Sequence, residues 1–367
     1  MNLVRKEIRR TVSIIVLSYN GMEHLPECLH SLDTQTDADF ELILVDNASS
    51  DGSAAWVREN YPRARVIESP RNIGFCAGMN LGLHHSNAEF VFFLNQDTIL
   101  ETLAVHELIT AMKHQSEDVI GAFPKVVFHA APLFINAFGV NWYASCHWRD
   151  TRVGLPDLGQ FQSYEQVFGS IFPAVLFRRK KFIEIGAFDE LFWSYCEDFD
   201  VCYRTQLFGY HLITVPGAVI RHKYRSSSRD ETNPLWSRYW FIRNYLLVFL
   251  KNYELVNLWR QRHIIFMRYI GHSIRSAWRN RNRAELAVYL KVLTNLLLNT
   301  PRIYKRRFFI QLHRKKSDHD IWRHNVVEEH NIYHVDGCIV LSLKSMRAAL
   351  RSEEYVYTVD HREYQSI

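Results

Sequence analysis

The chain has 367 residues, of which 47% are hydrophobic, and a formal net charge of +5. This composition is too apolar for a disordered protein, and the length is sufficient for one large or two ordinary domains. The six cysteines are scattered and include no Cys-x-x-Cys pair, which argues against a disulfide framework or a zinc ribbon and favours a reducing compartment.

The N-terminal residues are charged from Met1 to Arg10 and run directly into a short apolar stretch. A signal peptide would have a longer apolar stretch and a cleavage site made of small residues. The most hydrophobic segment, residues 239–250, contains Arg243, and no window of about 18 uncharged apolar residues predicts a spanning helix. We therefore expect a cytoplasmic protein.

Short apolar runs in the first hundred residues alternate with segments long enough for helices. The predicted strands are residues 12–17, 41–45, 65–68 and 89–94, and two of the predicted helices are residues 22–31 and 53–60. Such nearly continuous hydrophobicity is typical of parallel strands covered on both faces. The alternation of strand and helix predicts an α/β domain with a doubly wound sheet.

Polar residues follow three of the predicted strands at the point where each strand ends. They are Ser18-Tyr19-Asn20, Asp46-Asn47 and Asn95-Gln96-Asp97. Open α/β sheets bind their ligands just beyond the carboxyl ends of the strands, so these side chains are candidates for a site. Asp and Asn also begin turns and cap helices, which is the alternative interpretation of each residue by itself.

The first strand and the polar loop Asp46–Ser53 together carry a family resemblance. Helix capping would also explain the loop, but the pair resembles the opening of family 2 glycosyltransferases. These are GT-A fold enzymes that use nucleotide-sugars, and rhamnosyltransferase-like members act on bacterial cell-surface polysaccharides. The resemblance covers about residues 11–224 and implies a Rossmann-like, mostly parallel sheet flanked by helices.

The segment Arg71–Asn80 resembles the family's Asn-x-Gly-Phe-Ala stretch near the nucleotide, with Cys76 as an additional residue between Phe and Ala. Its glycines permit close approach of the backbone to a ligand, and Arg71 can pair with phosphate. Neither a Gly-x-Gly-x-x-Gly fingerprint nor a P-loop is present. The nucleotide-sugar contacts implied by the resemblance are Tyr19, Asn20, Asp46, Arg71, Asn72, Asn95, Gln96 and Asp97.

The segment Phe92–Thr98 aligns with the family's Asp-x-Asp region, which holds a divalent cation on the donor diphosphate. Asn95 replaces the first Asp, which weakens the metal affinity expected from sequence. The resemblance implies that Asp97 and His222 hold Mn²⁺ or Mg²⁺, completed by diphosphate oxygens and water. A turn role for Asp97 and a structural role for His222 are the alternatives.

The segments that most specifically follow the family's order lie between residues 168 and 200. They are Phe168–Ser170, Phe177–Arg179, Ile185–Glu190 and Tyr195–Asp200. The resemblance implies that Asp198 is the general base of an inverting transfer, with Glu197 beside it in the catalytic pair. Asp189 and Glu190 would orient the acceptor or support the site. Adjacent carboxylates raise each other's pKa, although acids at a helix start are also ordinary.

The C-terminal part is strongly basic, with 18 Lys and Arg against two acids between residues 236 and 316. Apolar residues at helical spacing predict an amphipathic face made of Leu286, Tyr289, Leu290, Leu293, Leu296 and Leu297. With aromatic residues such as Trp236 and Trp240, this pattern favours contact with an anionic membrane surface. The alternative is packing on the catalytic domain with solvated arginines. No nucleic-acid-binding fold is recognisable.

These patterns divide the chain into a catalytic domain at 1–235, a basic helical segment at 236–316 and a tail at 317–367, where residues 335–338 predict a turn. The predicted function is transfer of a sugar from a nucleotide-diphosphate donor to a lipid-linked or glycan acceptor in cell-surface polysaccharide assembly. A nucleotidyltransferase is one alternative. A binding protein on a degenerate transferase fold, favoured by Asn95, is another.

Overall fold

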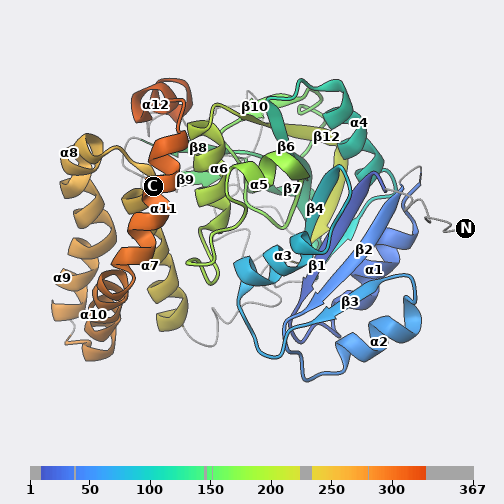
Figure 1. Cartoon of the computed structure of the whole chain (residues 1–367), viewed down its shortest axis with the longest axis horizontal. Helices are drawn as coiled ribbons and strands as arrows, with labels where there is room; N and C mark the ends of the chain where they lie inside the picture. Colours follow the sequence, from blue (N-terminus) through green and yellow to red (C-terminus); the bar gives the residue numbers. More distant parts are fainter. Residues whose placement is uncertain are drawn as a thin grey trace, which may run out of the picture.

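A ten-stranded sheet with its helices, a second sheet of three strands and a layer of C-terminal helices make up the computed structural model (Figure 1). The structure describes residues 10–36, 39–143, 147–150, 152–223, 234–279 and 281–327. The strands are β1 (Val12–Ser18), β2 (Phe40–Asp46), β3 (Arg65–Glu68), β4 (Phe90–Asn95), β5 (Thr98–Leu100), β6 (Val119–Phe128), β7 (Ala131–Ala137), β8 (Val140–Tyr143), β9 (His147–Asp150), β10 (Glu165–Val167), β11 (Ala174–Arg178), β12 (His211–His222) and β13 (Val326–Val327).

The helices surround the sheet in its N-terminal part and pack on one another after it. They are α1 (Leu25–Asp33), α2 (Ser53–Asn60), α3 (Phe75–His84), α4 (Ala104–His114), α5 (Arg179–Glu184), α6 (Glu197–Leu207), α7 (Pro234–Asn252), α8 (Leu255–Phe266), the π-helical turn η1 (Met267–Gly271), α9 (His272–Arg279), α10 (Arg283–Leu298), α11 (Thr300–His313) and α12 (Asp318–Asn325).

The central strands are buried on both faces, as their hydrophobic runs predict. In β1, Ile14 and Val16 belong to a core shared with α1 and α4, whereas Ile15 belongs to a core shared with α3 and α6. Successive side chains of a strand point to opposite faces, so one apolar run supplies both cores. The sheet is therefore covered by helices on its two sides.

The order of the main sheet is β10-β12-β6-β11-β4-β1-β2-β3. Strands β1, β2, β3 and β4 pair in parallel, and β12 pairs in parallel with β6. On this path β11 is antiparallel to both β4 and β6, and the edge strand β10 is antiparallel to β12. The α/β fold class with a mostly parallel sheet is confirmed, and the carboxyl ends of β1, β2 and β4 meet at one edge.

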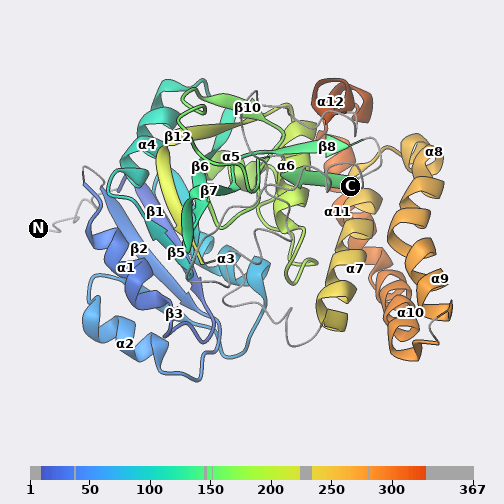
Figure 2. The same ribbon diagram turned by 180° about the vertical axis from the view of Figure 1, so that it is seen from behind.

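The helical layer begins with α7, which packs against α6, α10 and α11. Seen from behind, β8 extends from the sheet domain toward α12 (Figure 2), where β13 pairs with it in parallel. In the described residues, no helix is both long enough and apolar enough to cross a bilayer. The turn predicted at residues 335–338 lies outside the described residues.

The six residues predicted to form one apolar face of α10 are divided among buried, partly buried and exposed positions. Tyr289 and Leu296 are buried, but Leu290, Leu293 and Leu297 are exposed. Val288 and Val292 complete the buried face. The helix is apolar on more than one side, so periodicity alone could not identify which side packs against the rest of the protein.

Candidate active site

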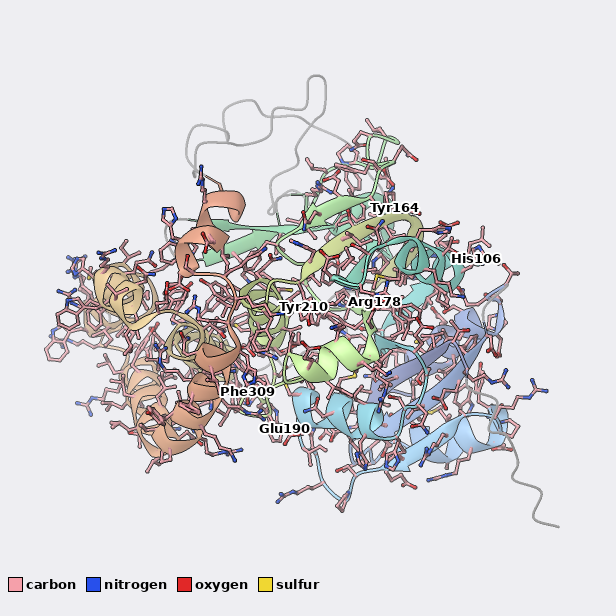
Figure 3. All side chains as sticks on the ribbon, turned by 45° about the horizontal axis from the view of Figure 1, so that its top comes forward. His106, Tyr164, Arg178, Glu190, Tyr210 and Phe309 are labelled. Carbon is pink, nitrogen blue, oxygen red and sulfur yellow. The ribbon has the colours of Figure 1, made fainter. Side chains whose placement is uncertain are left out.

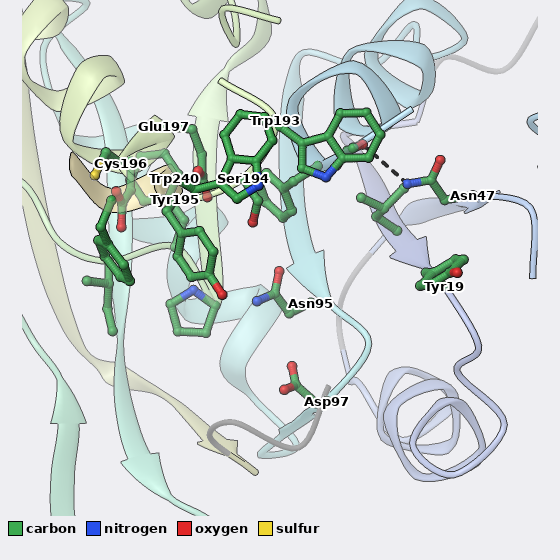
Figure 4. A pocket seen from close by; sticks show the side chains of 18 of the residues that line it. Tyr19, Asn47, Asn95, Asp97, Trp193, Ser194, Tyr195, Cys196, Glu197 and Trp240 are labelled. Atoms are coloured by element: carbon green, nitrogen blue, oxygen red, sulfur yellow. Dashed lines mark hydrogen bonds between the residues drawn. The ribbon is translucent and has the colours of Figure 1, made fainter. Parts of the chain in front are cut away.

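A cleft of about 790 Å³ lies at the carboxyl edge of the sheet. Eight of the residues predicted to form the site line it: Tyr19, Asn72, Asn95, Gln96, Asp97, Glu197, Asp198 and His222. The turn before α6 and the first part of α7 form its other walls (Figure 4). The cleft therefore brings together side chains that are up to two hundred positions apart in the chain.

Hydrogen bonds between neighbouring loops hold the strand ends in place around the cleft. The Asn47 amide nitrogen donates to Asn72 Oδ1 at 3.1 Å, and Asn47 Oδ1 accepts from the Ile73 backbone at 2.8 Å (Figure 4). Gln96 Oε1 accepts from the backbone N–H of Tyr19 at 3.1 Å. Two of these bonds tie the loop after β2 to the loop after β3, and the third ties the loop after β4 to the loop after β1, which gives a bound ligand a fixed surface.

The remaining predicted nucleotide contacts do not line the cleft. Asn20 Oδ1 accepts from the Ser50 backbone at 2.8 Å, and the buried Asp46 accepts from the Ser49 backbone at 3.1 Å. Arg71 is exposed at the surface. The two acceptors shape the polar loop after β2. The neighbouring Asn47, a strand-end candidate that was not among the predicted nucleotide contacts, lines the cleft in place of Asp46.

Asp97 and His222 meet at the floor of the cleft. The His222 Nε2 atom lies 3.5 Å from Asp97 Oδ2, and both residues are buried. On the other side of the imidazole, Nδ1 lies 2.8 Å from Oδ1 of the buried Asn136. Donation from Nδ1 to that oxygen leaves the Nε2 lone pair directed at Asp97, which is the orientation of a metal-binding imidazole.

The protein therefore offers a metal ion two ligands, Asp97 and His222, which do not complete a coordination shell. Among the described residues, no cluster of three or more His, Cys, Asp or Glu could hold a metal ion. One carboxylate and one imidazole suit Mn²⁺ or Mg²⁺ only when a ligand and water complete the coordination. The pair fits a cation that arrives with an anionic substrate.

The catalytic pair predicted from sequence occupies the first turn of α6. Two consecutive residues before it, Tyr195 and Cys196, have left-handed backbone conformations with φ of 70° and 63°. This conformation is strained for residues other than glycine and persists only where the surroundings enforce it. Asn244 of α7 enforces it here, because its amide donates to the carbonyls of Ser194 and Tyr195 at 2.7 and 2.8 Å.

The environment of the pair favours the protonated carboxyls. Removal from water raises the pKa of Asp198 to about 7. Burial, followed by repulsion from Asp198, raises the pKa of Glu197 to about 8. Asp198 keeps one compensating bond, with Oδ1 accepting from the Phe199 backbone at 2.7 Å. Groups with a pKa near neutrality can accept and release protons at physiological pH.

The raised pKa of Asp198 predicts a stability effect with a definite sign. A carboxyl whose pKa is higher in the folded state loses folding stability as pH rises from about 4, its unfolded value, to about 7. We expect Asp198→Asn to unfold at a higher temperature than the unchanged protein at pH 8, with a gain on the order of 1–4 kcal/mol, and to show little gain at pH 4.5.

The measurement is thermal unfolding at both pH values, with Asp33→Asn as the control. Asp33 is an exposed carboxylate at the end of α1, outside the cleft. A gain of equal size at pH 4.5 and pH 8 would contradict the raised pKa.

Asp189, predicted to support the acceptor, lies behind the cleft in a buried ion cluster. Lys251 of α7 pairs with both Asp189 and Asp200, and it lies 3.0 Å from Oδ1 of Asp200. Asp200 also accepts from Arg204 at 2.9 Å. Burial would raise the pKa of Asp189, but the charges of Lys251 and Arg306 lower it to about 2.

Glu190 is also absent from the cleft lining. Its Oε1 accepts from the Asn80 amide of α3 at 3.1 Å, and it lies beside α3 near the helical layer (Figure 3). Neither Asp189 nor Glu190 is therefore placed to touch a molecule in the cleft.

We expect Lys251→Met to destabilise the protein by about 3 kcal/mol or more, because two buried carboxylates lose the cation they share. The matched control is Lys181→Met, which removes a partly exposed pair with Glu184 and should have an effect below about 1 kcal/mol. Urea unfolding at pH 7 measures both. Equal effects of the two substitutions would show that the cluster around Lys251 does not stabilise the fold.

An aromatic wall faces the carboxylates, and sequence reasoning missed it as part of the site. It consists of Trp193, Tyr195, Trp236, Trp240 and Phe241. The rings of Trp193 and Trp240 stack with centroids 6.2 Å apart, and Tyr195 packs on Phe241 at 4.5 Å. Trp236 and Trp240 were expected to face a membrane, but α7 directs them into the cleft. Nothing in the local pattern of α7 indicated that its first turns form a cavity wall.

Gly74 lets the loop after β3 approach this wall. Its φ is +84°, and a Cβ atom there would lie 2.8 Å from the ring and the carbonyl of Trp193. The carbonyl of Trp193 accepts from the Phe75 backbone at 2.7 Å. A side chain larger than glycine would separate the two segments, so the close approach explains why the motif has glycine there.

Residues 13–186 match the family model described as Glycosyl transferase family 2. The chain is therefore similar to this family over nearly half of its length. It is 25% identical over 244 residues to an N-acetylglucosaminyl-diphospho-decaprenol L-rhamnosyltransferase of Mycobacterium tuberculosis, covering 60% of this chain and 79% of the relative. It is 34% identical over 116 residues to the poly(ribitol-phosphate) beta-N-acetylglucosaminyltransferase TarP of Staphylococcus aureus, covering 30% and 36%.

Among solved structures, the glycosyltransferase is similar to GalNAc-T7 with UDP, GalNAc and Mn²⁺. The TM-score is 0.52 at 16% sequence identity, and the match covers 67% of this chain and 48% of that chain. The glycosyltransferase thus spans about half the length of that structure, and the likeness is one of fold. The GT-A architecture implied by the family resemblance is confirmed.

Proposed function

We propose that this chain is an inverting glycosyltransferase that moves a hexosyl or deoxyhexosyl group from a nucleotide diphosphate to a hydroxyl group. One observation carries the proposal. A single cleft is lined by the Glu197 and Asp198 carboxyls on one wall and by Asp97 and His222 on its floor. A base for the acceptor and a site for a diphosphate thus face the same space, which a sugar transfer requires.

In the proposed reaction, Asp198 takes the proton of the acceptor hydroxyl as its oxygen attacks the anomeric carbon of the donor. The new bond joins that carbon to the acceptor oxygen, and the bond to the diphosphate oxygen breaks. The electron pair leaves with the nucleoside diphosphate, and attack opposite to it inverts the anomeric configuration. A carboxylate with a pKa near 7 is a suitable base at neutral pH. Glu197 holds its proton to higher pH and can donate a hydrogen bond.

Asp97 and His222 would hold Mn²⁺ or Mg²⁺, with Asn136 orienting the imidazole. Such a cation, when bound, neutralises negative charge on the departing diphosphate. Asn95 lines the cleft above Asp97 (Figure 4), where a neutral amide oxygen can accept a hydrogen bond from the sugar or contribute to the ion's surroundings.

The donor would lie along the loops after β1, β2, β3 and β4. Tyr19, Asn72 and Gln96 line this part of the cleft, and the exposed Arg71 stands in the same loop as Asn72, where it can pair with phosphate. Asn20 and Asp46 would act through the loops that they shape. The resemblance to rhamnosyltransferase-like members makes a deoxythymidine-diphosphate sugar the first donor to test.

The acceptor would occupy the aromatic wall, because indole and phenol rings stack on the apolar faces of sugar rings. We place the reaction in the cytoplasm, at the inner face of the plasma membrane, on a lipid-linked or glycan acceptor of a cell-surface polysaccharide. The relative from M. tuberculosis, named for a diphospho-decaprenol substrate, supports this choice of acceptor class.

The test begins with thermal unfolding in the presence of Mn²⁺ and a panel of UDP-, GDP- and dTDP-sugars, because a donor stabilises the state that binds it. With the donor so identified, we expect Asp198→Asn to keep the donor-induced stabilisation. We expect it to lower sugar transfer by a factor of about 10² to 10⁴, the range for loss of a general base. Chromatography of the nucleoside diphosphate and of the glycosylated acceptor measures transfer.

Asp33→Asn is again the control and should transfer at the unchanged rate. Near-normal turnover of Asp198→Asn would refute its role as base. Pyrophosphate release from a nucleoside triphosphate would instead indicate a nucleotidyltransferase, and no stabilisation by any donor would favour a binding protein.

The metal assignment predicts that EDTA lowers the donor-induced rise in unfolding temperature and that added Mn²⁺ restores it. In His222→Ala we expect the restoring Mn²⁺ concentration to rise at least about tenfold, because one of two protein ligands is lost. Replacing His211 by Ala is the control, since this histidine lies at the start of β12, outside the cleft. Donor stabilisation that is insensitive to EDTA would contradict the assignment.

A further inference from the structure

The outer surface of the C-terminal helices exposes many large hydrophobic side chains. Of the nineteen such side chains found in the described part of the chain, thirteen lie between residues 255 and 312. They are Leu255, Val256, Trp259, Ile264, Phe266, Trp278, Leu290, Leu293, Leu297, Leu298, Tyr304, Phe308 and Leu312. Exposed apolar surface that is concentrated in this way marks an interaction site rather than ordinary scatter.

The exposed hydrophobic residues of α10 and those of α11 each follow helical spacing. On α10, Leu290, Leu293 and Leu297 are 67%, 45% and 73% exposed, although Val292 on the other side is buried. On α11, Tyr304, Phe308 and Leu312 repeat every fourth residue and are at least 60% exposed. Each helix therefore has one apolar face that packs on α7 and a second apolar face that contacts solvent.

The charge of the same surface has a single sign. Residues 255–305 contain ten Lys and Arg, all of them exposed, and one acid. That acid, Glu285, is buried and pairs with Arg238. In Figure 3 the side chains of α8 and α9 project outward from the body of the molecule, many of them ending in nitrogen. The exposed cations therefore face solvent without an exposed acid in that segment.

We propose that this helical outer surface, residues 255–312, docks on an anionic lipid bilayer. Apolar side chains would enter the headgroup region, while the long Lys and Arg side chains extend to lipid phosphates. Arg262 already stacks on Trp259, with its guanidinium 3.9 Å from the ring centroid, which pairs a cation and an aromatic ring at one level.

The positive charge of this surface favours a bilayer over a second copy of the chain as its binding partner. Two copies joined through this surface would bring ten cations of each copy against the other's, and like charges in close apposition oppose association. An anionic bilayer supplies the complementary charge together with an apolar layer. The surface also shares α7 with the cleft, since the same helix lines the cleft at one end and supports α10 and α11 along its length.

The test is flotation of the full-length protein with phosphatidylcholine vesicles, with and without phosphatidylglycerol. We expect binding to the anionic vesicles only, weakened by high salt because exposed charges are screened. The triple substitution Leu290→Ser, Leu293→Ser, Leu297→Ser should weaken binding at least about tenfold. Its thermal unfolding should be unchanged, because all three side chains are exposed.

The matched control carries Leu133→Ser, Leu158→Ser and Ile183→Ser, three exposed apolar residues outside the helical layer, and should bind as the unchanged protein does. Failure of the unchanged protein to float, or equal flotation of the α10 triple variant, would overturn the proposal. So would a dimer in gel filtration that the α10 substitutions dissociate, since the occupant would then be a second copy. None of these outcomes depends on sugar transfer.

Discussion

Lys251 holds α6, the helix that begins with Glu197 and Asp198, against the rest of the protein. Its ammonium group is fully buried and pairs with Asp189 before α6 and with Asp200 in the first turn of α6. One cation of α7 therefore joins α6 and the loop before it to a helix fifty residues further along the chain. Asn244, two turns earlier on α7, fixes the strained turn at Tyr195 and Cys196. Through these contacts α7 sets the position of Asp198, whose chemistry depends on small differences in distance.

Much of the fold could be predicted because the signals are local. The hydrophobic runs of β1 and β4 are long and continuous, and polar residues mark their ends, so both the parallel sheet and the edge that carries the cleft follow from the sequence. The face on which α10 packs could not be predicted. Apolar residues surround more than half of that helix, so only the contact with α7 decides which of them are buried.

Some residues of the candidate site could be predicted from the sequence and others could not. Four of its residues occur in sequence motifs that are recognisable from their neighbours, and all four line the cleft: Asp97, Glu197, Asp198 and His222. Asp189 stands in an equally recognisable segment, yet its partner Lys251 comes from a helix sixty residues further on, which no local pattern reveals. The aromatic wall was missed for the same reason, because Trp236 and Trp240 become cleft residues only through the packing of α7.

Helix α7 belongs both to the cleft and to the C-terminal helical layer, and this affects how chimaeras of such enzymes can be built. A change in composition near residue 235 suggests a natural joint between a transferase module and an appendage, but α7, which begins at Pro234, lines the cleft and pairs with Asp189 and Asp200. A chimaera joined at that point would combine the carboxylates of one parent with the aromatic wall and the buried lysine of another. Grafts that keep residues 11–327 together preserve both the cleft lining supplied by α7 and the pairing of Lys251 with Asp200.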